Sequence, residues 1–414
     1  MNPTTQASAH ATGQPSDGIG DAERRQQAID ISGWGEPFHF WQPRNACLWV
    51  YVALVVTGLF KMVQMFAPLA GYYAPAFSAG AAIAVVSTLG WAWWFHHLDR
   101  FERQPFTVVL ACFLWGGLAA PFAIAIAGNG ALGSLYSKVG GAVWGANWSA
   151  GLSAPFVEES AKAAGFILIL GLAPRLVRTP ADGIFLGAFI GLGFQTFEDF
   201  LYAVAAATGS FGSDQVGAVT GGIAIRVFSD IVSHPMFSAL VCAGLIYLIG
   251  TPAQPRRVGR GLLLVGAGAG VHLVLDSLAV IGADSNVPAI LLLFGEFVLG
   301  LGVLWYAFRV ADYREREFAR DILRPEVTGG VLSADELDAL TGHQQRRAYL
   351  KASPNRRERR KRRHVLSAAL DLCADLADAK GADTPDVIAS RTEVTRIRGR
   401  AAVPPAEPVS APSG

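Results

Sequence analysis

Residues 152–173 read LSAPFVEESAKAAGFILILGLA, a stretch that is apolar enough to cross a bilayer although it contains three ionisable side chains. A helix needs about 20 mainly apolar residues to span the hydrocarbon core. Glu158, Glu159 and Lys162 lie within five consecutive positions, and each charge near the centre of a spanning helix costs about 2.5–3.5 kcal/mol. The sequence therefore predicts a membrane helix whose charges have partners on neighbouring helices.

The rest of the chain is also rich in apolar residues. Hydrophobic residues make up 52% of the 414 residues, charged residues only 16%, and the mean hydropathy is +0.35, whereas soluble domains have about 25% charged residues. Charged residues are rare between residues 45 and 310 and frequent after residue 310. Long apolar runs predict an all-α bundle of about eight transmembrane helices, at residues 46–66, 75–95, 106–127, 150–172, 183–205, 220–249, 261–281 and 287–309.

The segments between these helices predict their orientation. The alternate segments 96–105, 173–182 and 250–260 each contain arginines, whereas the other connecting segments together contain a single basic residue, Lys138. Because positively charged loops stay on the cytoplasmic side, we expect a multi-pass cell-membrane protein with both termini in the cytoplasm. The Ala- and Gly-rich composition without organelle signals hints at a bacterial origin.

Four regions follow from these patterns. Residues 1–44 are polar and lack the apolar core of a signal peptide, so we expect a disordered cytosolic extension, followed by the transmembrane domain at 45–310. Residues 311–380 are predicted to form a cytosolic helical region, and 381–414, rich in Pro, Ala, Ser and Gly, a disordered tail. The evidence for helices in the third region is a capping box and an apolar stripe, formed by Ser333 with Glu336, and by Leu366, Leu370, Cys373 and Leu376.

A polybasic stretch within the cytosolic region contains seven basic residues. We expect it to attract anionic lipids, at about 1 kcal/mol per charge near the surface, and a solvated helix face is the simpler alternative. Nucleic-acid binding is disfavoured because no aromatic residues are interleaved with the charges. The sequence indicates no oligomeric state. The basic residues are Arg356, Arg357, Arg359, Arg360, Lys361, Arg362 and Arg363.

Ionisable residues also lie inside the three spans that follow residue 173. At 1.5 Å per residue, Glu159, Glu198, His234 and His272 lie at depths of about 16–23 Å from the cytosolic face. Four consecutive helices thus bring carboxylates and imidazoles to one level, which predicts a shared polar pocket. Spacing of four residues also predicts same-face pairs, namely Glu158 with Lys162, Arg226 with Asp230, Asp230 with His234, and His272 with Asp276.

This set of side chains fits more than one chemistry. Two histidines with several carboxylates suit a metal such as zinc, which would activate water for hydrolysis. Without a metal, a glutamate can act as the general base while a histidine orients the water or the oxyanion. No HExxH or GxGD motif lies within a span, so the corresponding protease mechanisms are poorly supported.

Four short motifs follow one another on successive spans. EESAK at 158–162 matches EExxK, FQTFE at 194–198 matches FxxxE, His234 begins HxxxS, and HLVLD at 272–276 matches HxxxD. In this order they resemble the PrsW family of intramembrane proteases, within the wider superfamily of type II CAAX prenyl endopeptidases. DRFERQP at 99–105 is similar to the family as well, and the resemblance covers about residues 75 to 290.

The resemblance implies proteolysis of a membrane protein, such as a membrane-anchored anti-sigma factor. By motif position it implies catalytic roles for Glu158, Glu159, Glu198, His234 and His272, and, if a metal such as Zn²⁺ is used, ligation by His234, His272, Glu159 and Glu198. Which of the two adjacent glutamates contacts the water stays open.

Supporting roles and other functional classes follow from the same residues. Asp276 would orient His272, Lys162 would balance the glutamate pair, and Arg226 with Asp230 would be a structural or a functional pair. A secondary transporter that uses the cluster for proton or ion coupling is an alternative, and so is a scaffold without catalytic activity.

Overall fold

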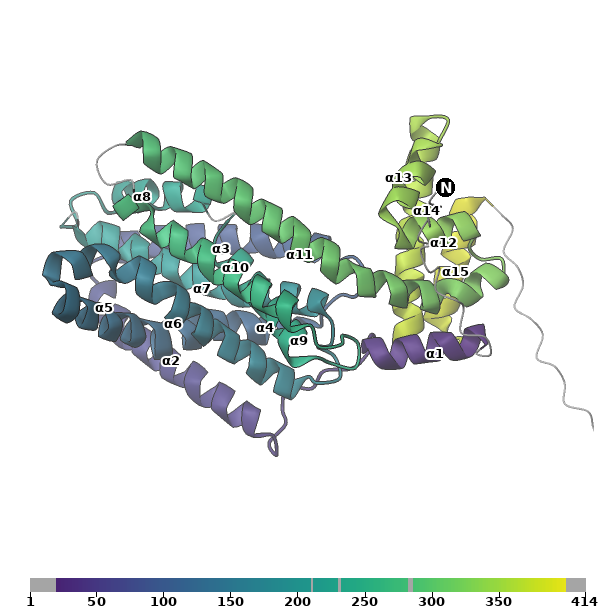
Figure 1. The fold of residues 1–414 in the computed structure, drawn as a ribbon, viewed down its shortest axis with the longest axis horizontal. Helices are drawn as coiled ribbons and strands as arrows, with labels where there is room; N and C mark the ends of the chain where they lie inside the picture. Colours follow the sequence, from purple (N-terminus) through teal and green to yellow (C-terminus); the bar gives the residue numbers. More distant parts are fainter. Residues whose placement is uncertain (1–19, 210, 230–231, 282–285, 400–414) are drawn as a thin grey trace, which may run out of the picture.

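The computed structural model describes residues 20–209, 211–229, 232–281 and 286–399, and every regular element in this part of the chain is a helix. Figure 1 shows a long bundle formed by α2 to α10 and the first part of α11, with a smaller group at one end formed by α1 and α12 to α15. The predicted all-α membrane bundle is therefore confirmed.

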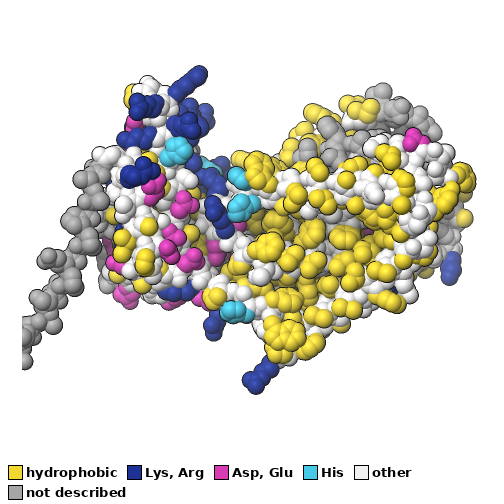
Figure 2. Space-filling view, turned by 180° about the vertical axis from the view of Figure 1, so that it is seen from behind, with side chains coloured by type: hydrophobic (Ala, Val, Ile, Leu, Met, Phe, Trp, Pro, Cys, Tyr) yellow, Lys and Arg dark blue, Asp and Glu magenta, His cyan; other side chains and the backbone are white. Residues whose placement is uncertain are grey.

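Six of the described helices are long and apolar enough to cross a membrane. Figure 2 shows hydrophobic side chains over the bundle and charged side chains gathered on the smaller group, as expected for a protein only partly embedded in lipid. Two further bundle helices are α6 (Ala142–Leu172), which carries the three charges, and α9 (His234–Ile249), which has only 16 residues. The six are α2 (Ala46–Ala70), α3 (Ala74–Leu98), the continuous stretch Phe106–Gly140, α7 (Pro180–Gly209), α10 (Val258–Ile281) and α11 (Asn286–Thr328).

The stretch 106–140 changes its helical winding part-way along. It consists of α4 (Phe106–Leu114), the π-helix η1 (Trp115–Ala125) and α5 (Ile126–Gly140). Pro121 lies inside η1, and proline disrupts the regular hydrogen bonding of an α-helix. We predicted that the helix ends at residue 127. It instead continues for 13 residues and turns into α6 at Gly141, whose φ of 89° favours glycine.

The predicted span 220–249 is wrong as a single helix. The chain forms α8 (Gln215–Ser229) and, separately, α9, which begins at His234. Ser233 has extended backbone angles, and Pro235 occupies the first turn of α9, where its missing N–H group is tolerated. Arg226 and His234 therefore lie on different helices. Asp230 falls outside the described residues, so its pairs with them remain predictions.

Three glycines place α9 against α7 in the centre of the bundle. A Cβ added at Gly191 would lie 2.2 Å from the carbonyl oxygen of His234, and one added at Gly187 would lie 2.5 Å from that of Ser238. Gly183 faces Ala243 in the same way. Small residues repeated every four positions allow membrane helices to approach closely. This spacing on α7 fixes the start of α9, and hence His234.

The smaller group has a hydrophobic core of its own. The 43 residues of α11 span about 64 Å at 1.5 Å per residue, about twice the hydrocarbon core, so its second half extends beyond the membrane. The predicted capping box of Ser333 and Glu336 is confirmed, and Leu366, Cys373 and Leu376 are buried as predicted. The group comprises α1 (Asp21–Ser32), α12 (Ala334–Thr341), α13 (His343–Lys351), α14 (Arg356–Asp378) and α15 (Pro385–Arg398).

Two segments that we predicted to be disordered contain helices. α1 lies within residues 1–44 and α15 within residues 381–414. Both helices meet at Glu326 of α11, which is 3% exposed and accepts hydrogen bonds at 2.8 Å from Arg25 of α1 and Arg391 of α15. Tertiary contacts thus order two polar helices whose own sequences are weakly amphipathic. Residues 1–19 and 400–414 lie outside the described part of the chain.

The polybasic stretch forms the first two turns of α14. Five of its basic residues are exposed. Lys361 instead donates to the carbonyl oxygen of Arg398 at 3.3 Å, and the guanidinium of Arg362 lies 4.7 Å from the ring centroid of Tyr349. Five of the seven predicted basic residues are therefore available to a lipid or another partner. The exposed ones are Arg356, Arg357, Arg359, Arg360 and Arg363.

The arginine-containing connections lie at the end of the bundle that carries the smaller group. Arg178 donates to the carbonyl oxygen of Ile31 in α1 at 3.0 Å. Ala253 belongs to the core of the smaller group, and Arg100 and Arg103 line a cavity together with residues of α14. All three segments are therefore on one side, as the charge pattern predicts.

Candidate active site

The predicted polar pocket lies inside the bundle, where α6, α7, α9 and α10 meet. α6 supplies Glu158, Glu159 and Lys162, and α7 supplies Glu198. His234 is the first residue of α9, and His272 with Asp276 comes from α10. The structure brings these four helices into contact through the ionisable side chains that the depth estimate placed at one level.

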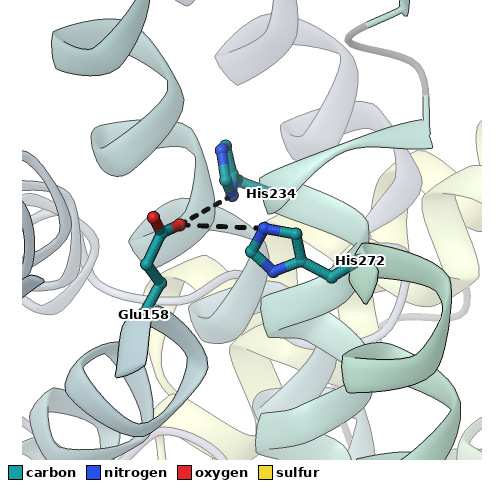
Figure 3. A group of neighbouring side chains, drawn as sticks. All are labelled: Glu158, His234 and His272. Atoms are coloured by element: carbon teal, nitrogen blue, oxygen red, sulfur yellow. Dashed lines mark ion pairs between the residues drawn. The ribbon is translucent and has the colours of Figure 1, made fainter. Parts of the chain in front are cut away.

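Glu158 and the two histidines form the centre of the pocket (Figure 3). Glu158 Oε2 lies 3.7 Å from His272 Nε2 and 4.0 Å from His234 Nδ1. This oxygen is buried and has no hydrogen-bond partner in the part of the chain that the structure describes. Among the described residues, this is the group whose potential metal-binding atoms all lie within 4.8 Å of one another.

A carboxylate lies behind each imidazole, on the nitrogen that faces away from Glu158. Glu198 Oε2 is 2.8 Å from His234 Nε2, and Glu159 Oε1 is 3.1 Å from His272 Nδ1. Such carboxylates fix the tautomer and orientation of histidines that bind a metal. From sequence we proposed Glu159 and Glu198 as ligands. The structure instead groups Glu158 with the histidines and places the other two glutamates on the outer nitrogens.

Lys162 is completely buried and contacts three of these groups. Its Nζ lies 2.8 Å from Glu159 Oε1, 2.8 Å from His234 Nδ1 and 3.9 Å from Glu158 Oε2. The ammonium also lies 4.0 Å from the ring centroid of Phe194, which adds a cation–π contact. Lys162 thus offsets part of the negative charge of the glutamate pair.

A second layer of polar residues surrounds Glu198. Arg226 of α8 lies 2.8 Å from Glu198 Oε2 and 2.7 Å from Asp199 Oδ1, and Gln195 donates to Asp199 at 2.9 Å. Asp276 Oδ2 lies 3.4 Å from His272 Nε2. The predicted supporting residues that the structure describes therefore surround the pocket.

Three polar residues of the site are not among those predicted from the sequence. Asp199 and Gln195 flank Glu198 on α7, and a carboxylate directly after the glutamate of FQTFE was a signal for the former. Asn129 of α5 donates a hydrogen bond to Glu158 Oε1 at 2.9 Å. It lies in a region predicted to be a loop on the outer side, and no spacing pattern connects it with Glu158.

A cavity of about 500 Å³ opens beside these residues. Glu158, Glu198, His234 and Asp276 line it, whereas Glu159 does not. The Glu198 side chain is 19% exposed, against 7% for Glu158 and 5% for Glu159. Glu198 is therefore the glutamate most accessible to water and substrate.

Residues 104–308 match the PrsW family intramembrane metalloproteases. Through its membrane domain, this chain belongs to the PrsW family. No curated protein and no solved structure gives a significant match to the chain.

The PrsW match contains every side chain of the pocket and ends within α11. The helices α1, α2 and α3, and the smaller group that contains the polybasic stretch, lie outside the matched residues. The family relationship therefore bears on the pocket and its reaction, and it carries no information about the smaller group. It establishes a multi-pass membrane protein of a protease family.

Proposed function

We propose that this protein hydrolyses a peptide bond of a membrane protein at the level of the bilayer. The observation that carries the proposal is the meeting of Glu158, His234 and His272 beside a 500 Å³ cavity inside the bundle. Its membership of the PrsW family supports the same reaction. No feature of the described residues specifically favours transport.

The donor set of the pocket fits the metal that the family name implies. Among the described residues, Glu158 Oε2 is buried between two imidazole nitrogens and accepts no hydrogen bond, and one carboxylate with two histidines is a common ligand set of catalytic zinc. Binding requires that Lys162 leave His234 Nδ1 and keep its contact with Glu159. When bound, such an ion lowers the pKa of a water molecule and polarises a carbonyl group.

The remaining residues hold the reactants and move the proton. Glu198, the most exposed glutamate, takes a proton from water as the water oxygen bonds to the carbonyl carbon of the substrate. The C–N bond then breaks, and Glu198 returns the proton to the leaving nitrogen. Glu159 and Glu198 orient His272 and His234, while Lys162 and Arg226 offset part of the negative charge of the neighbouring carboxylates.

The substrate is proposed to be a membrane-anchored regulatory protein such as an anti-sigma factor. We further propose that the end of the bundle with the arginine-containing connections faces the cytoplasm, as loop charge favours. The five exposed arginines of α14 would then contact anionic lipids of the inner leaflet.

Quantitative membrane proteomics tests the reaction. Cells with wild-type protein are compared with cells expressing Glu158→Gln, His272→Ala and, as a control, Lys138→Gln, which alters an exposed residue of α5. The first two variants should accumulate the same full-length membrane protein, and the control should not. If all three match the wild type, proteolysis at this pocket is refuted.

Elemental analysis of the purified proteins then separates the two forms of the mechanism. Stoichiometric zinc in the wild type that is lost in His272→Ala supports ligation by the three residues. A wild type that cleaves its substrate without any metal would instead assign Glu158 as the base that activates water.

A further inference from the structure

Asn129 reaches the active site from a helix that supplies none of the residues assigned above. Its amide nitrogen donates to Glu158 Oε1 at 2.9 Å, and the residue lines the cavity. Building on the proposed function, we propose that Asn129 is a positioning residue for hydrolysis. It holds the Glu158 carboxylate so that Oε2 points toward His234 and His272.

The two oxygens of Glu158 have different surroundings. Oε1 accepts a hydrogen bond from Asn129, whereas Oε2 faces the imidazoles at 3.7 and 4.0 Å and accepts no hydrogen bond from any described residue. The terminal torsion of a glutamate is broad, so the backbone of α6 alone does not select this orientation. Without the amide, the carboxylate is free to turn toward Lys162 Nζ, which lies 3.9 Å from Oε2.

The packing of α5 on α6 is specific at this point. A Cβ added at Gly128 would lie 2.6 Å from Val157 Cγ1, so only glycine allows this approach without a shift. The next residue of each helix forms the Asn129–Glu158 hydrogen bond. Further along the same pair of helices, Tyr136 donates to the carbonyl oxygen of Leu152 at 3.1 Å. These consecutive contacts fix the register that brings the amide to the carboxylate.

The carbonyl oxygen of the Asn129 side chain indicates that packing alone does not account for an asparagine at this position. Asn129 Oδ1 is buried and has no hydrogen-bond partner among the described residues, and an unpaired polar atom is unfavourable in such a place. An apolar side chain would fill the position without this cost. The contact that distinguishes asparagine here is the hydrogen bond to Glu158.

Purified Asn129→Ala and Asn129→Asp proteins test this role. Zinc affinity is measured by chelator competition, thermal stability by Tm, and kcat and KM with the membrane protein that accumulates in Glu158→Gln cells. Asn147→Ala, at an exposed position of α6, is the matched control. Asn129→Ala should weaken zinc binding by about 10–100-fold and lower kcat at nearly constant KM, because Asn129 contacts Glu158 and not the substrate.

The aspartate variant separates hydrogen-bond donation from shape. It keeps the size of asparagine but cannot donate to Glu158 when ionised, so it should be at least as impaired as Asn129→Ala. Wild-type zinc affinity and kcat in either variant would overturn the proposal. So would a lower Tm with unchanged zinc affinity below that Tm, because this pattern indicates a structural role.

The controls distinguish failure of this inference from failure of the proposed function. A wild type that neither binds zinc nor cleaves the substrate refutes the proposed function, and the role of Asn129 with it. If the wild type cleaves without zinc, the kcat and KM values decide, and an unchanged kcat in Asn129→Ala overturns the inference.

Discussion

Glu159 and Glu198 both lie behind an imidazole, yet their removal should have different consequences. Glu159→Gln and Glu198→Gln each replace a carboxylate by an amide of the same size. Glu159 accepts hydrogen bonds from Lys162 and His272, and its side chain is 5% exposed. Glu198 is 19% exposed and pairs with Arg226, which has a second carboxylate partner.

The distances allow the two effects to be compared. Lys162 Nζ lies 2.8 Å from Glu159 and 3.9 Å from Glu158, which corresponds to attractions of about 6 and about 4 kcal/mol at an effective dielectric constant of about 20. Glu159→Gln removes the larger attraction from a buried ammonium, and breaking a buried pair costs about 3–5 kcal/mol. In Glu198→Gln, Arg226 keeps Asp199 at 2.7 Å, so we expect a loss of about 1 kcal/mol.

Thermal unfolding of the detergent-purified variants measures this difference. We expect Tm to fall on the order of 10 °C in Glu159→Gln and by about 2–4 °C in Glu198→Gln, with proteolysis lost in both. Glu36→Gln serves as the control, because it removes a pair with Lys380 in which the side chains are 26% and 39% exposed. A Tm of Glu159→Gln equal to that of the wild type, or a larger fall in Glu198→Gln, would refute the reasoning.

Three further predictions concern the framework around the site. Burial, together with the carboxylates of Asp182, Glu315 and Asp99, raises the pKa of Glu102 well above its ordinary value. The folded state therefore keeps a proton that the unfolded state loses, so Tm should fall as pH rises above the ordinary carboxyl range. The variant Glu102→Gln cannot lose this proton, so its Tm should fall less over the same pH range. Gly191→Ala places a Cβ 2.2 Å from the His234 carbonyl oxygen, so it should lower the free energy of unfolding by about 1–3 kcal/mol and reduce proteolysis. The control is Gly221→Ala, whose Cβ would have no described atom within 4 Å, and it should leave Tm and activity unchanged. Glu326→Gln leaves Arg25 and Arg391 without their shared partner and should therefore accelerate limited proteolysis at α1 and α15. The control is Glu393→Gln, which changes an exposed side chain of α15. Equal cleavage rates in the two variants would contradict the proposed anchoring.

The sequence predicted the location of the site better than its internal geometry. Apolar length and loop charge are properties of single segments, so they identified most of the spanning helices and placed Glu159, Glu198, His234 and His272 at one depth. Depth fixes the position along a helix axis. It leaves open the rotation of each helix, and adjacent residues such as Glu158 and Glu159 point about 100° apart. Which glutamate faces the histidines is decided by packing between helices.

Contacts between distant segments explain the other differences. The break before His234 combines a local signal, Pro235 in the first turn of α9, with the close approach of Gly187 and Gly191 of α7 to the start of that helix. α1 and α15 bury only a few apolar side chains, such as Ile29 and Val387, in the core of the smaller group, and both also bind Glu326, about 300 residues from α1 along the chain. Local composition therefore indicated disorder where contacts with distant segments, apolar as well as ionic, stabilise helices.

The balance of charge in the pocket links the unusual sequence of α6 to its chemistry. Five carboxylates gather there, and among the described residues the cationic side chains in contact with them are Lys162 and Arg226. Carboxylates inside a membrane are strongly unfavourable unless their charge is balanced, so the pocket must take up protons or a cation. A divalent ion between Glu158 and the histidines offsets more of this charge than one proton does. The fold therefore keeps a site with excess negative charge, and under the proposed function a cation bound there would stabilise the same helices that position the reacting groups. The carboxylates are Glu158, Glu159, Glu198, Asp199 and Asp276.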